Sequence, residues 1–248
     1  MALKVKDFLI QVLKTGPVPK HISIVMDGNR RYARKNHKEI VEGHNAGFDT
    51  MSTTLETCYK AGINTVTVFA FSIENFKRPT YQVNQLMDIA KQRLTQICEN
   101  GELAEQYGVR VRVIGNRALL PDDVRDVCEK VEALTKNNNQ VCLNICFPYT
   151  SRDDIAQAIR KTVAKVENNE LDADSVDEQT LESNMYLGES PPVDMLIRSS
   201  GVERFSDFML WQSTNSDGIT IEFVETLWPE FNFWTLYKIL LKWSLQKV

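Results

Sequence analysis

The sequence predicts an α/β fold whose core is a six-stranded, mainly parallel sheet flanked by helices. Six segments are close to continuously apolar, as strands that are covered on both faces are. Segments with the apolar spacing of helices alternate with them, and this alternation favours parallel strands joined by crossover helices. A chain of 248 residues is long enough for one large domain of this kind or two small ones.

The elements follow one another without an internal repeat or a linker. Strands are predicted at residues 21–27, 64–72, 109–115, 140–147, 193–200 and 219–226. Helices are predicted at about 39–61, 80–107, 121–137, 151–167 and 177–187. The polar stretch 167–180 is the most loop-like segment, but it lies between helices and does not divide domains. We therefore expect a single domain over residues 17–248.

Both ends of the chain carry apolar helical patterns. Residues 1–16 are predicted to form a short amphipathic helix that Gly16 and Pro17 end. Two interpretations stay open for this helix: it docks on its own domain, or it has a membrane-surface or lid role. The segment Phe233–Lys247 is apolar and aromatic, which suits burial against this domain or another subunit.

Composition and missing motifs exclude several functional classes. The net charge of −4 disfavours generic nucleic-acid binding. The sequence contains no run of eighteen apolar residues, so it predicts no membrane-spanning helix. The charged N-terminus does not resemble a signal peptide. Five cysteines form no CxxC pair, so we interpret Cys142 and Cys146 as small core side chains in a reducing compartment. The P-loop, GxGxxG, HExxH and GxSxG motifs do not occur.

Polar side chains follow four of the predicted strands directly. The first strand runs into MDGNRR, the second into FSIENFKR, the fourth into FPYTSR and the fifth into RSSGVERFSD. Ligands of open parallel sheets bind beyond the carboxyl ends of the strands. We therefore expect these four strand ends to meet at one edge of the sheet. The candidate binding residues form four groups along the chain: MDGNRR, EGHNAG, FSIENFKRP and RSSGVERFSDF.

The first group combines a carboxylate, a glycine and two arginines. Gly28 lets backbone N–H groups approach an anion, and Arg30 and Arg31 can each bind two phosphate oxygens. Asp27 would repel a phosphate here unless a divalent cation lay between them, and Mg²⁺ takes one or two carboxylates together with substrate phosphates. Two interpretations stay open for Asp27: a metal ligand, or an ion-pair partner of Arg30 or Arg31.

The second and third groups are further candidates for anion binding. His44 stands at a helix start with free N–H groups, where it either donates a hydrogen bond to phosphate or has a structural role. Ser72, Asn75 and Arg78 either face one pocket at the end of the second strand or form a plain loop held by a salt bridge.

The fourth group places two arginines around a glycine turn. Arg198 and Arg204 are six residues apart, and Ser206 suits both a phosphate contact and the N-cap of a helix over FMLWQ. With the first group, this makes two anion sites, a candidate Mg²⁺ ligand and no obvious covalent nucleophile. Such a pocket suits a reaction that places two phosphorylated molecules side by side.

Five motifs in order resemble the cis-prenyltransferases: MDGNRRYA, EGHNAGF, FAFSIENFKRP, IRSSGVERFSDFMLWQ and LWPEF. The resemblance extends from about Pro17 to Lys247 and is closest to the fungal type of eukaryotic dehydrodolichyl diphosphate synthase. It implies an enzyme that adds isopentenyl diphosphate units to a farnesyl-type allylic diphosphate with new cis double bonds. The implied fold encloses a hydrophobic tunnel, and the implied product is a long polyprenyl diphosphate for dolichol synthesis and protein glycosylation.

The resemblance also implies roles for individual residues. Asp27 would hold Mg²⁺ and the allylic diphosphate, and Ser72 and Asn75 would serve at the reacting end. The remaining residues implied in substrate binding are Gly28, Asn29, Arg30, Arg31, His44, Arg78, Arg198, Arg204 and Ser206. Mg²⁺ and arginines would stabilise the charge that grows on the leaving diphosphate, while the alkene of the second substrate is the nucleophile.

The helix over residues 80–107 carries an apolar stripe, and such a stripe usually packs in a core. Its members are Val83, Leu86, Met87, Ala90, Leu94, Ile97 and Leu103. The resemblance makes it a wall of the product tunnel instead. The stretch QICENGELAEQYG late in this helix resembles the longer version found in relatives with long products. We therefore expect a long polyprenyl product.

The resemblance implies that two subunits together complete each active site. An Arg-x-Gly near the C-terminus of one subunit would reach the diphosphates bound in the other. No arginine in this sequence is followed two places on by glycine. We therefore expect a heterodimer with a second, related subunit, with a homodimer as the alternative. The expected location is peripheral, on the cytosolic face of the endoplasmic reticulum membrane or on lipid droplets.

The competing function is a non-catalytic scaffold paralogue that supports an active subunit. Such subunits of the family typically lose the aspartate of the first motif and the arginines of the fourth. Asp27, Arg198 and Arg204 are all present here, so we expect catalysis.

Overall fold

The computed structural model describes residues 2–100, 107–214 and 218–247. Six strands in this part of the chain form one sheet in the order β3-β4-β2-β1-β5-β6, and every neighbouring pair is parallel. The strands are β1 (His21–Val25), β2 (Thr65–Phe69), β3 (Val109–Ile114), β4 (Val141–Cys146), β5 (Met195–Arg198) and β6 (Thr220–Phe223). Each lies inside its predicted range, so the predicted α/β fold with a six-stranded parallel sheet is confirmed.

Strand β1 lies at the centre of the sheet, between β2 and β5. The chain first completes the β2 side, where β4 lies between β2 and the edge strand β3, and then crosses to β5 and β6 on the other side. This reversal of strand order creates a crevice at the carboxyl ends of the central strands. The site expected at the end of β1 therefore lies at the topological switch point.

The two faces of the sheet differ in chemistry because side chains alternate along each strand. Ile22 and Ile24 of β1 belong to the larger apolar core. Between and beside them, polar side chains are buried and bonded to one another. His21 Nε2 lies 2.7 Å from Thr67 Oγ1, and Asn144 donates to the same hydroxyl at 3.0 Å. The second face thus carries a buried, hydrogen-bonded polar network that joins β1, β2 and β4.

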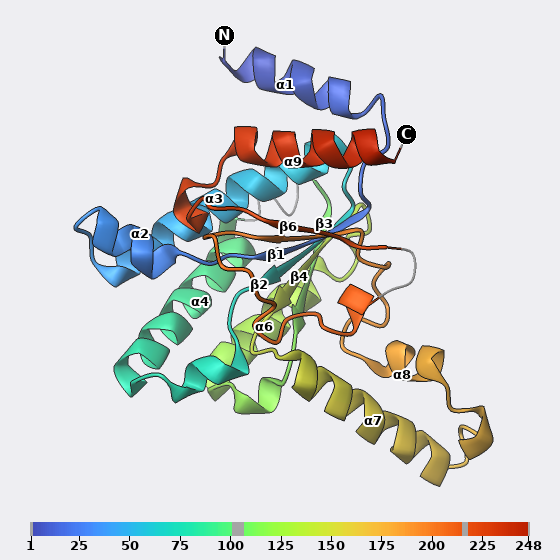
Figure 1. Ribbon diagram of the computed structural model, residues 1–248. Coiled ribbons are helices and arrows are strands. Elements are labelled where there is room, and N and C mark those ends of the chain that lie inside the picture. The colour runs from blue at the N-terminus through green and yellow to red at the C-terminus, as the bar shows by residue number, and fades with distance from the viewer. Residues whose placement is uncertain (1, 101–106, 215–217, 248) are drawn as a thin grey trace.

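Helices cover both faces of the sheet (Figure 1). They are α1 (Ala2–Leu13), α2 (Asn29–Lys35), α3 (Ile40–Ala61), α4 (Thr80–Asn100), α6 (Asp122–Thr135), α7 (Ser151–Glu167), α8 (Glu178–Asn184) and α9 (Phe233–Gln246). Figure 1 shows α1 and α9 together at the top with α3 beneath them, and α7 with α8 on the opposite side. Helices α4 and α6 pack against each other, and α6 packs on strand β3.

The structure differs from the predicted elements in a few places. Helix α2 was not predicted, because it is only seven residues long, mostly basic and without apolar periodicity. Helix α8 is shorter than the predicted 177–187. Helix α4 is described as far as Asn100, and residues 101–106 of the predicted 80–107 lie outside the described residues. All five cysteines are free; Cys146 is buried as expected, whereas Cys142 is half-buried.

The N-terminal helix α1 docks on its own domain. Its side chains Ile10 and Leu13 are buried, and the helix packs against α3 and α9. Its outer face is nevertheless apolar, because Phe8 is 66% exposed and Val5 and Val12 are exposed beside it. Among the helices that the structure describes, none is both long enough and apolar enough to cross a bilayer.

Candidate active site

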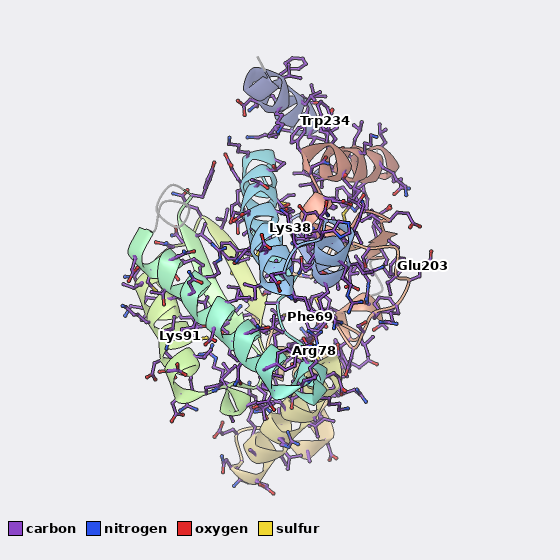
Figure 2. The ribbon with its side chains drawn as sticks, turned by 90° about the vertical axis from the view of Figure 1, so that its left-hand side faces the viewer. Lys38, Phe69, Arg78, Lys91, Glu203 and Trp234 are labelled. Atoms are coloured by element: carbon purple, nitrogen blue, oxygen red, sulfur yellow. The ribbon has the colours of Figure 1, made fainter. Side chains whose placement is uncertain are left out.

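A cavity of about 730 Å³ lies at the carboxyl ends of the central strands, with α3 and α4 as two of its walls. Figure 2 shows Phe69 at the end of β2 and Arg78 just before α4, both in this region between the two helices. Every site residue predicted from the sequence lines this cavity: Asp27, Gly28, Asn29, Arg30, Arg31, His44, Ser72, Asn75, Arg78, Arg198, Arg204 and Ser206. The cavity thus lies where we expected it from the rule that open parallel sheets bind ligands beyond the carboxyl ends of their strands.

Asp27 connects the first and fourth groups. Its Oδ2 accepts a hydrogen bond from Arg198 Nη2 at 2.9 Å and lies 3.8 Å from Arg31 Nη2. The sequence suggested an ion pair with Arg30 or Arg31, but the shorter pair is the one with Arg198, 171 residues away. In this structure Asp27 is thus already an ion-pair partner, and its carboxylate faces the cavity with 37% of the side chain exposed.

Gly28 makes the turn after β1 possible. Its φ of 115° is in the left-handed region, and an added Cβ would lie 3.0 Å from the backbone nitrogen of Trp228. The turn leads directly into α2, whose first residues are Asn29, Arg30 and Arg31. Arg31 is held by a hydrogen bond from Nη1 to the carbonyl of Ser200 at 3.0 Å. Two guanidinium groups are thereby placed next to Asp27.

His44 lies inside α3, one turn beyond its first residue, and not before the helix as the sequence suggested. Its backbone N–H is therefore not a free donor at the helix start, and His44 can bind an anion only through its imidazole. Burial, together with the positive charges of Arg78 and Arg30, lowers the pKa of His44 to about 4. The imidazole is neutral at neutral pH, and it offers one N–H donor and one acceptor nitrogen to the cavity.

Ser72 and Asn75 fix each other at the end of β2. Ser72 Oγ accepts from the backbone N–H of Glu74 at 3.2 Å, and Asn75 Oδ1 accepts from the backbone N–H of Ser72 at 3.2 Å. These bonds start the short helix η1 (Ile73–Lys77). Glu74 also pairs with Lys77 and Arg152. Both interpretations of this segment therefore hold: it is a salt-bridged loop, and its polar side chains face the cavity.

The fourth group forms a rigid cluster around Arg198, whose side chain is only 3% exposed. Arg198 Nη1 donates to Ser206 Oγ at 2.8 Å, and Arg204 Nε donates to the same oxygen at 3.2 Å. The predicted N-cap role of Ser206 is wrong, because residues 206–211 form turns and no helix. Ser206 has a φ of 52°, and its hydroxyl links two arginines instead of capping a helix.

The loop that carries this cluster has several residues in an unfavourable backbone conformation. Ser200, Ser206, Asp207 and Met209 all have positive φ without being glycine. Such conformations persist only where neighbouring contacts enforce them, and they gather at functional sites. One such contact is the ion pair of Asp207 Oδ2 with Arg152 Nε at 2.7 Å. The loop thus holds Arg204 and Ser206 in place at the rim of the cavity.

Two supporting residues were not singled out from the sequence. Ser199 Oγ donates to the carbonyl of Asp27 at 2.7 Å and accepts from its N–H at 3.0 Å. Trp228 donates its backbone N–H to the same carbonyl at 2.9 Å and its indole N–H to Gly47 at 2.7 Å. Both residues belong to motifs quoted above, but nothing local in the sequence indicates that they hold the Asp27 turn.

A metal ion in this cavity would need ligands from the side chains of its walls. Among the residues that the structure describes, no group of three His, Cys, Asp or Glu side chains is placed to hold one. Asp27 is a partly exposed carboxylate on the cavity wall, and the other two carboxylates that line the cavity, Glu74 and Asp207, both pair with Arg152. This arrangement fits Mg²⁺, which binds through one or two carboxylates and completes its shell with water and substrate phosphates.

The apolar part of the cavity runs along α4. Four residues of the predicted stripe line it: Leu86, Ala90, Leu94 and Ile97. Met87 of the same stripe is buried in the core, and Leu103 lies outside the described residues. The helix therefore serves both as core and as cavity wall. A polar rim with an apolar interior can hold an amphiphile with a charged head and a hydrocarbon tail.

Comparisons with known proteins identify relatives over most of the chain. The family model described as "putative undecaprenyl diphosphate synthase" matches residues 25–248. A dehydrodolichyl diphosphate synthase complex subunit from Schizosaccharomyces pombe is 44% identical, over 98% of this chain and 91% of the relative. The human dehydrodolichyl diphosphate synthase complex subunit is also 44% identical, over 96% of this chain and 71% of that protein.

Solved structures share the fold. A lavandulyl diphosphate synthase from Lavandula x intermedia, in complex with dimethylallyl diphosphate, superposes with a TM-score of 0.85 at 30% identity. A probable undecaprenyl diphosphate synthase from Campylobacter jejuni superposes with a TM-score of 0.74, also at 30% identity. Each match covers 92% of this chain and 95% of the other.

Proposed function

The chain belongs to the cis-prenyltransferase family, and on this premise we propose how its cavity carries out the family's reaction. It is a prenyl transferase that condenses isopentenyl diphosphate with an allylic diphosphate to make a polyprenyl diphosphate of the dehydrodolichyl type. The observation that supports this function best is that one cavity joins two groups of arginines, on either side of Asp27, to an apolar wall.

The allylic diphosphate would bind at the first group of residues. Arg30 and Arg31 face the cavity beside the left-handed turn at Gly28. Their guanidinium groups, the N–H of neutral His44 and the amide of Asn29 would contact its oxygens. The hydrocarbon tail of a farnesyl-type primer would then lie along the apolar residues of α4.

Isopentenyl diphosphate would bind at the fourth group. Arg198 and Arg204 already converge on Ser206 Oγ, so a diphosphate needs little reorganisation to bind both guanidinium groups. Arg198 Nε is buried and unpartnered within the described part of the chain, and it offers a further donor. Asp27 lies between the two proposed sites because it pairs with Arg31 on one side and Arg198 on the other.

Asp27 is the residue that would hold Mg²⁺ together with the diphosphate oxygens. The bound ion would supply charge stabilisation for the diphosphate that departs from the allylic carbon. Arg30, Arg31 and Arg78 would stabilise the same growing charge, more strongly in the transition state than in the ground state. The alkene of isopentenyl diphosphate would attack the allylic carbon, which explains why the cavity needs no protein nucleophile.

Ser72 and Asn75 would act at the reacting end of the site. Ser72 Oγ accepts from the backbone N–H of Glu74 and Asn75 Oδ1 accepts from the backbone N–H of Ser72, and these bonds keep both side chains at the cavity wall before substrate arrives. Asn75 would help to remove the final proton by relaying it toward the second diphosphate. Pre-organisation of this kind is what an orientation-dependent condensation requires.

A partner subunit is part of the proposal. The relatives from fission yeast and human are named as subunits of a dehydrodolichyl diphosphate synthase complex. We propose that a second, related subunit supplies an Arg-x-Gly to this cavity, because no such tripeptide occurs in the residues given. A homodimer is the alternative. Trp234 and Leu245 of α9 are exposed and would suit contact with another subunit.

Membrane contact and location are proposed from the exposed face of α1. Phe8, with Val5 and Val12 beside it, would rest on a lipid surface while Ile10 and Leu13 hold the helix on the domain. The enzyme would then sit peripherally on the cytosolic face of the endoplasmic reticulum or on lipid droplets, where its long product can be released. The relatives' role in dolichol synthesis is compatible with this location.

The test is the incorporation of labelled isopentenyl diphosphate by the purified chain, alone and with a related subunit. With farnesyl diphosphate and Mg²⁺, label should enter a long apolar product, and omission of either should abolish it. No incorporation under any of these conditions would contradict catalysis. It would also revive the scaffold alternative, which the names of the relatives do not favour.

A further inference from the structure

Arg93 is a charged residue in the apolar wall of the cavity. It lies on α4 beside Ala90, Leu94 and Ile97, all of which line the same space. Thirteen residues separate it from the start of the helix at Thr80, which places it about 20 Å along the helix axis at the ideal rise. A cation at this position needs an explanation, because burying a charge beside hydrocarbon is unfavourable unless it is well bonded.

The guanidinium of Arg93 is bonded to neutral groups. Its Nη2 donates to Asn45 Oδ1 at 2.8 Å, and its Nη1 donates to Gln96 Oε1 at 3.0 Å. Its central carbon lies 4.5 Å from the centroid of the Phe48 ring, within the range of a cation–π contact. In the described part of the chain, Nε is buried without a partner and no carboxylate pairs with the group.

These contacts join the two helices that border the cavity. Asn45 and Phe48 belong to α3, whereas Arg93 and Gln96 belong to α4. The two helices pack mainly on other elements, since α3 contacts α1, α2, α9 and the Trp228 segment while α4 contacts α6. Neither Asn45 nor Gln96 lines the cavity, so Arg93 reaches from the cavity wall into the space between the helices.

We propose that this arrangement, the Arg93 strut, closes the side of the product tunnel between α3 and α4 and thereby helps to set product length. The proposal rests on the function proposed above. A growing polyprenyl tail must pass the strut as it lengthens, and elongation ends when the tunnel offers no more room. The planar fork of arginine suits this role because it bonds to both helices and stacks on Phe48 at once.

Arg93 could instead bind a substrate diphosphate, and the loss of its side chain would have different effects in the two cases. Removal of Arg93 would open the wall sideways and leave more room for the tail, so products should become longer and more widely distributed. A diphosphate ligand would instead raise the KM for one substrate and leave the lengths unchanged. Arg93 is thus a specificity-determining residue and not a catalytic one in this proposal.

The experiment compares product lengths from the enzyme in its active form, with its partner subunit if one is required. In Arg93→Ala, the main product should shift upward by at least one isoprene unit, while the KM for each diphosphate stays within about twofold of wild type. Asn45→Ala should shift lengths in the same direction, and the double variant should add little to either single change. Arg93→Lys, which keeps the charge but not the planar fork, should show most of the upward shift of Arg93→Ala.

Lys91→Ala is the matched control. It removes a cation from the same helix, but Lys91 pairs with Asp123 at 2.6 Å, and Figure 2 shows it pointing away from Phe69 and Arg78. Its products should match wild type. Should Arg93→Ala fold poorly, Arg93→Met keeps an apolar wall of similar length without the bonds to α3, and it should show the same upward shift.

Wild-type product lengths from both Arg93→Ala and Asn45→Ala would overturn the strut while leaving the proposed function intact. A raised KM with unchanged lengths would overturn it as well, in favour of a diphosphate contact. A wild-type enzyme that incorporates no isopentenyl diphosphate would overturn both proposals, so the two kinds of failure are distinguishable.

Discussion

Replacement of Asp27 can test two roles of its carboxylate, the ion pair with Arg198 and the proposed binding of Mg²⁺. In Asp27→Ala, Arg198 loses its carboxylate partner at 2.9 Å while its side chain remains only 3% exposed. It keeps two acceptors, the carbonyl of Arg204 and the hydroxyl of Ser206. The substitution should therefore affect stability as well as activity.

The expected magnitude follows from the burial of the pair. Breaking a fully buried pair costs about 3–5 kcal/mol, but Asp27 is 37% exposed, so water screens part of the loss. We expect about 1–3 kcal/mol of lost stability, which lowers the Tm of a domain of this size by about 2–12 °C. A bound diphosphate should recover part of this loss because its oxygens replace the carboxylate beside Arg198.

Asp27→Asn is the discriminating variant. Its amide oxygen can still accept from Arg198, so the Tm should fall less than in Asp27→Ala. It cannot supply an anionic ligand to Mg²⁺, so kcat/KM should fall by well over tenfold, more than ~1.4 kcal/mol of transition-state stabilisation. Calorimetry and isopentenyl diphosphate incorporation measure the two effects. An Asp27→Asn enzyme with more than about a tenth of wild-type kcat/KM would refute the metal-ligand role.

Three further predictions concern pH, product length and assembly. Burial lowers the pKa of His21 in the fold below its unfolded value of about 6.5, so its contribution to stability is present above that pH and is lost as the pH falls toward the folded pKa. Urea unfolding at about pH 7.5 and pH 5 should show a smaller acid-induced loss in His21→Gln than in wild type; equal losses would contradict the assignment. Ala90→Phe should shorten the products by at least one isoprene unit, because Ala90 lines the apolar wall, and an unchanged distribution would place the tail elsewhere. The chain purified alone should be much less active than the chain co-purified with a related subunit, and equal activities at saturating Mg²⁺ and substrates would contradict the need for a partner.

Strand ends were the part of the site that the sequence predicted well. Parallel strands share one direction, so polar residues that follow each strand must meet at the same edge. Asp27, Ser72, Arg78 and Arg198 come from three different strand ends and all line one cavity. This outcome required only that the strands were identified and parallel, and not that their boundaries were correct.

Pairings across the fold could not be predicted in the same way. For Asp27 as an ion-pair partner, the sequence indicated only its neighbours Arg30 and Arg31. Arg31 does lie 3.8 Å away, but β5 lies next to β1 and brings Arg198 to 2.9 Å. Ser206 looked like a helix cap because its neighbours are apolar, yet those neighbours fold into turns. Arg93 gave no signal at all, since its partner Asn45 lies 48 residues away on another helix.

The most direct test of the two-site arrangement is a crystal structure with Mg²⁺ and a non-ionisable thio analogue of farnesyl diphosphate, with the partner subunit present if activity requires it. We expect the diphosphate beside Arg31, a metal ion on Asp27, and the tail along Ala90 and Leu94. A diphosphate bound at Arg198 with its tail away from α4, or a metal ion that does not touch Asp27, would contradict the proposed arrangement.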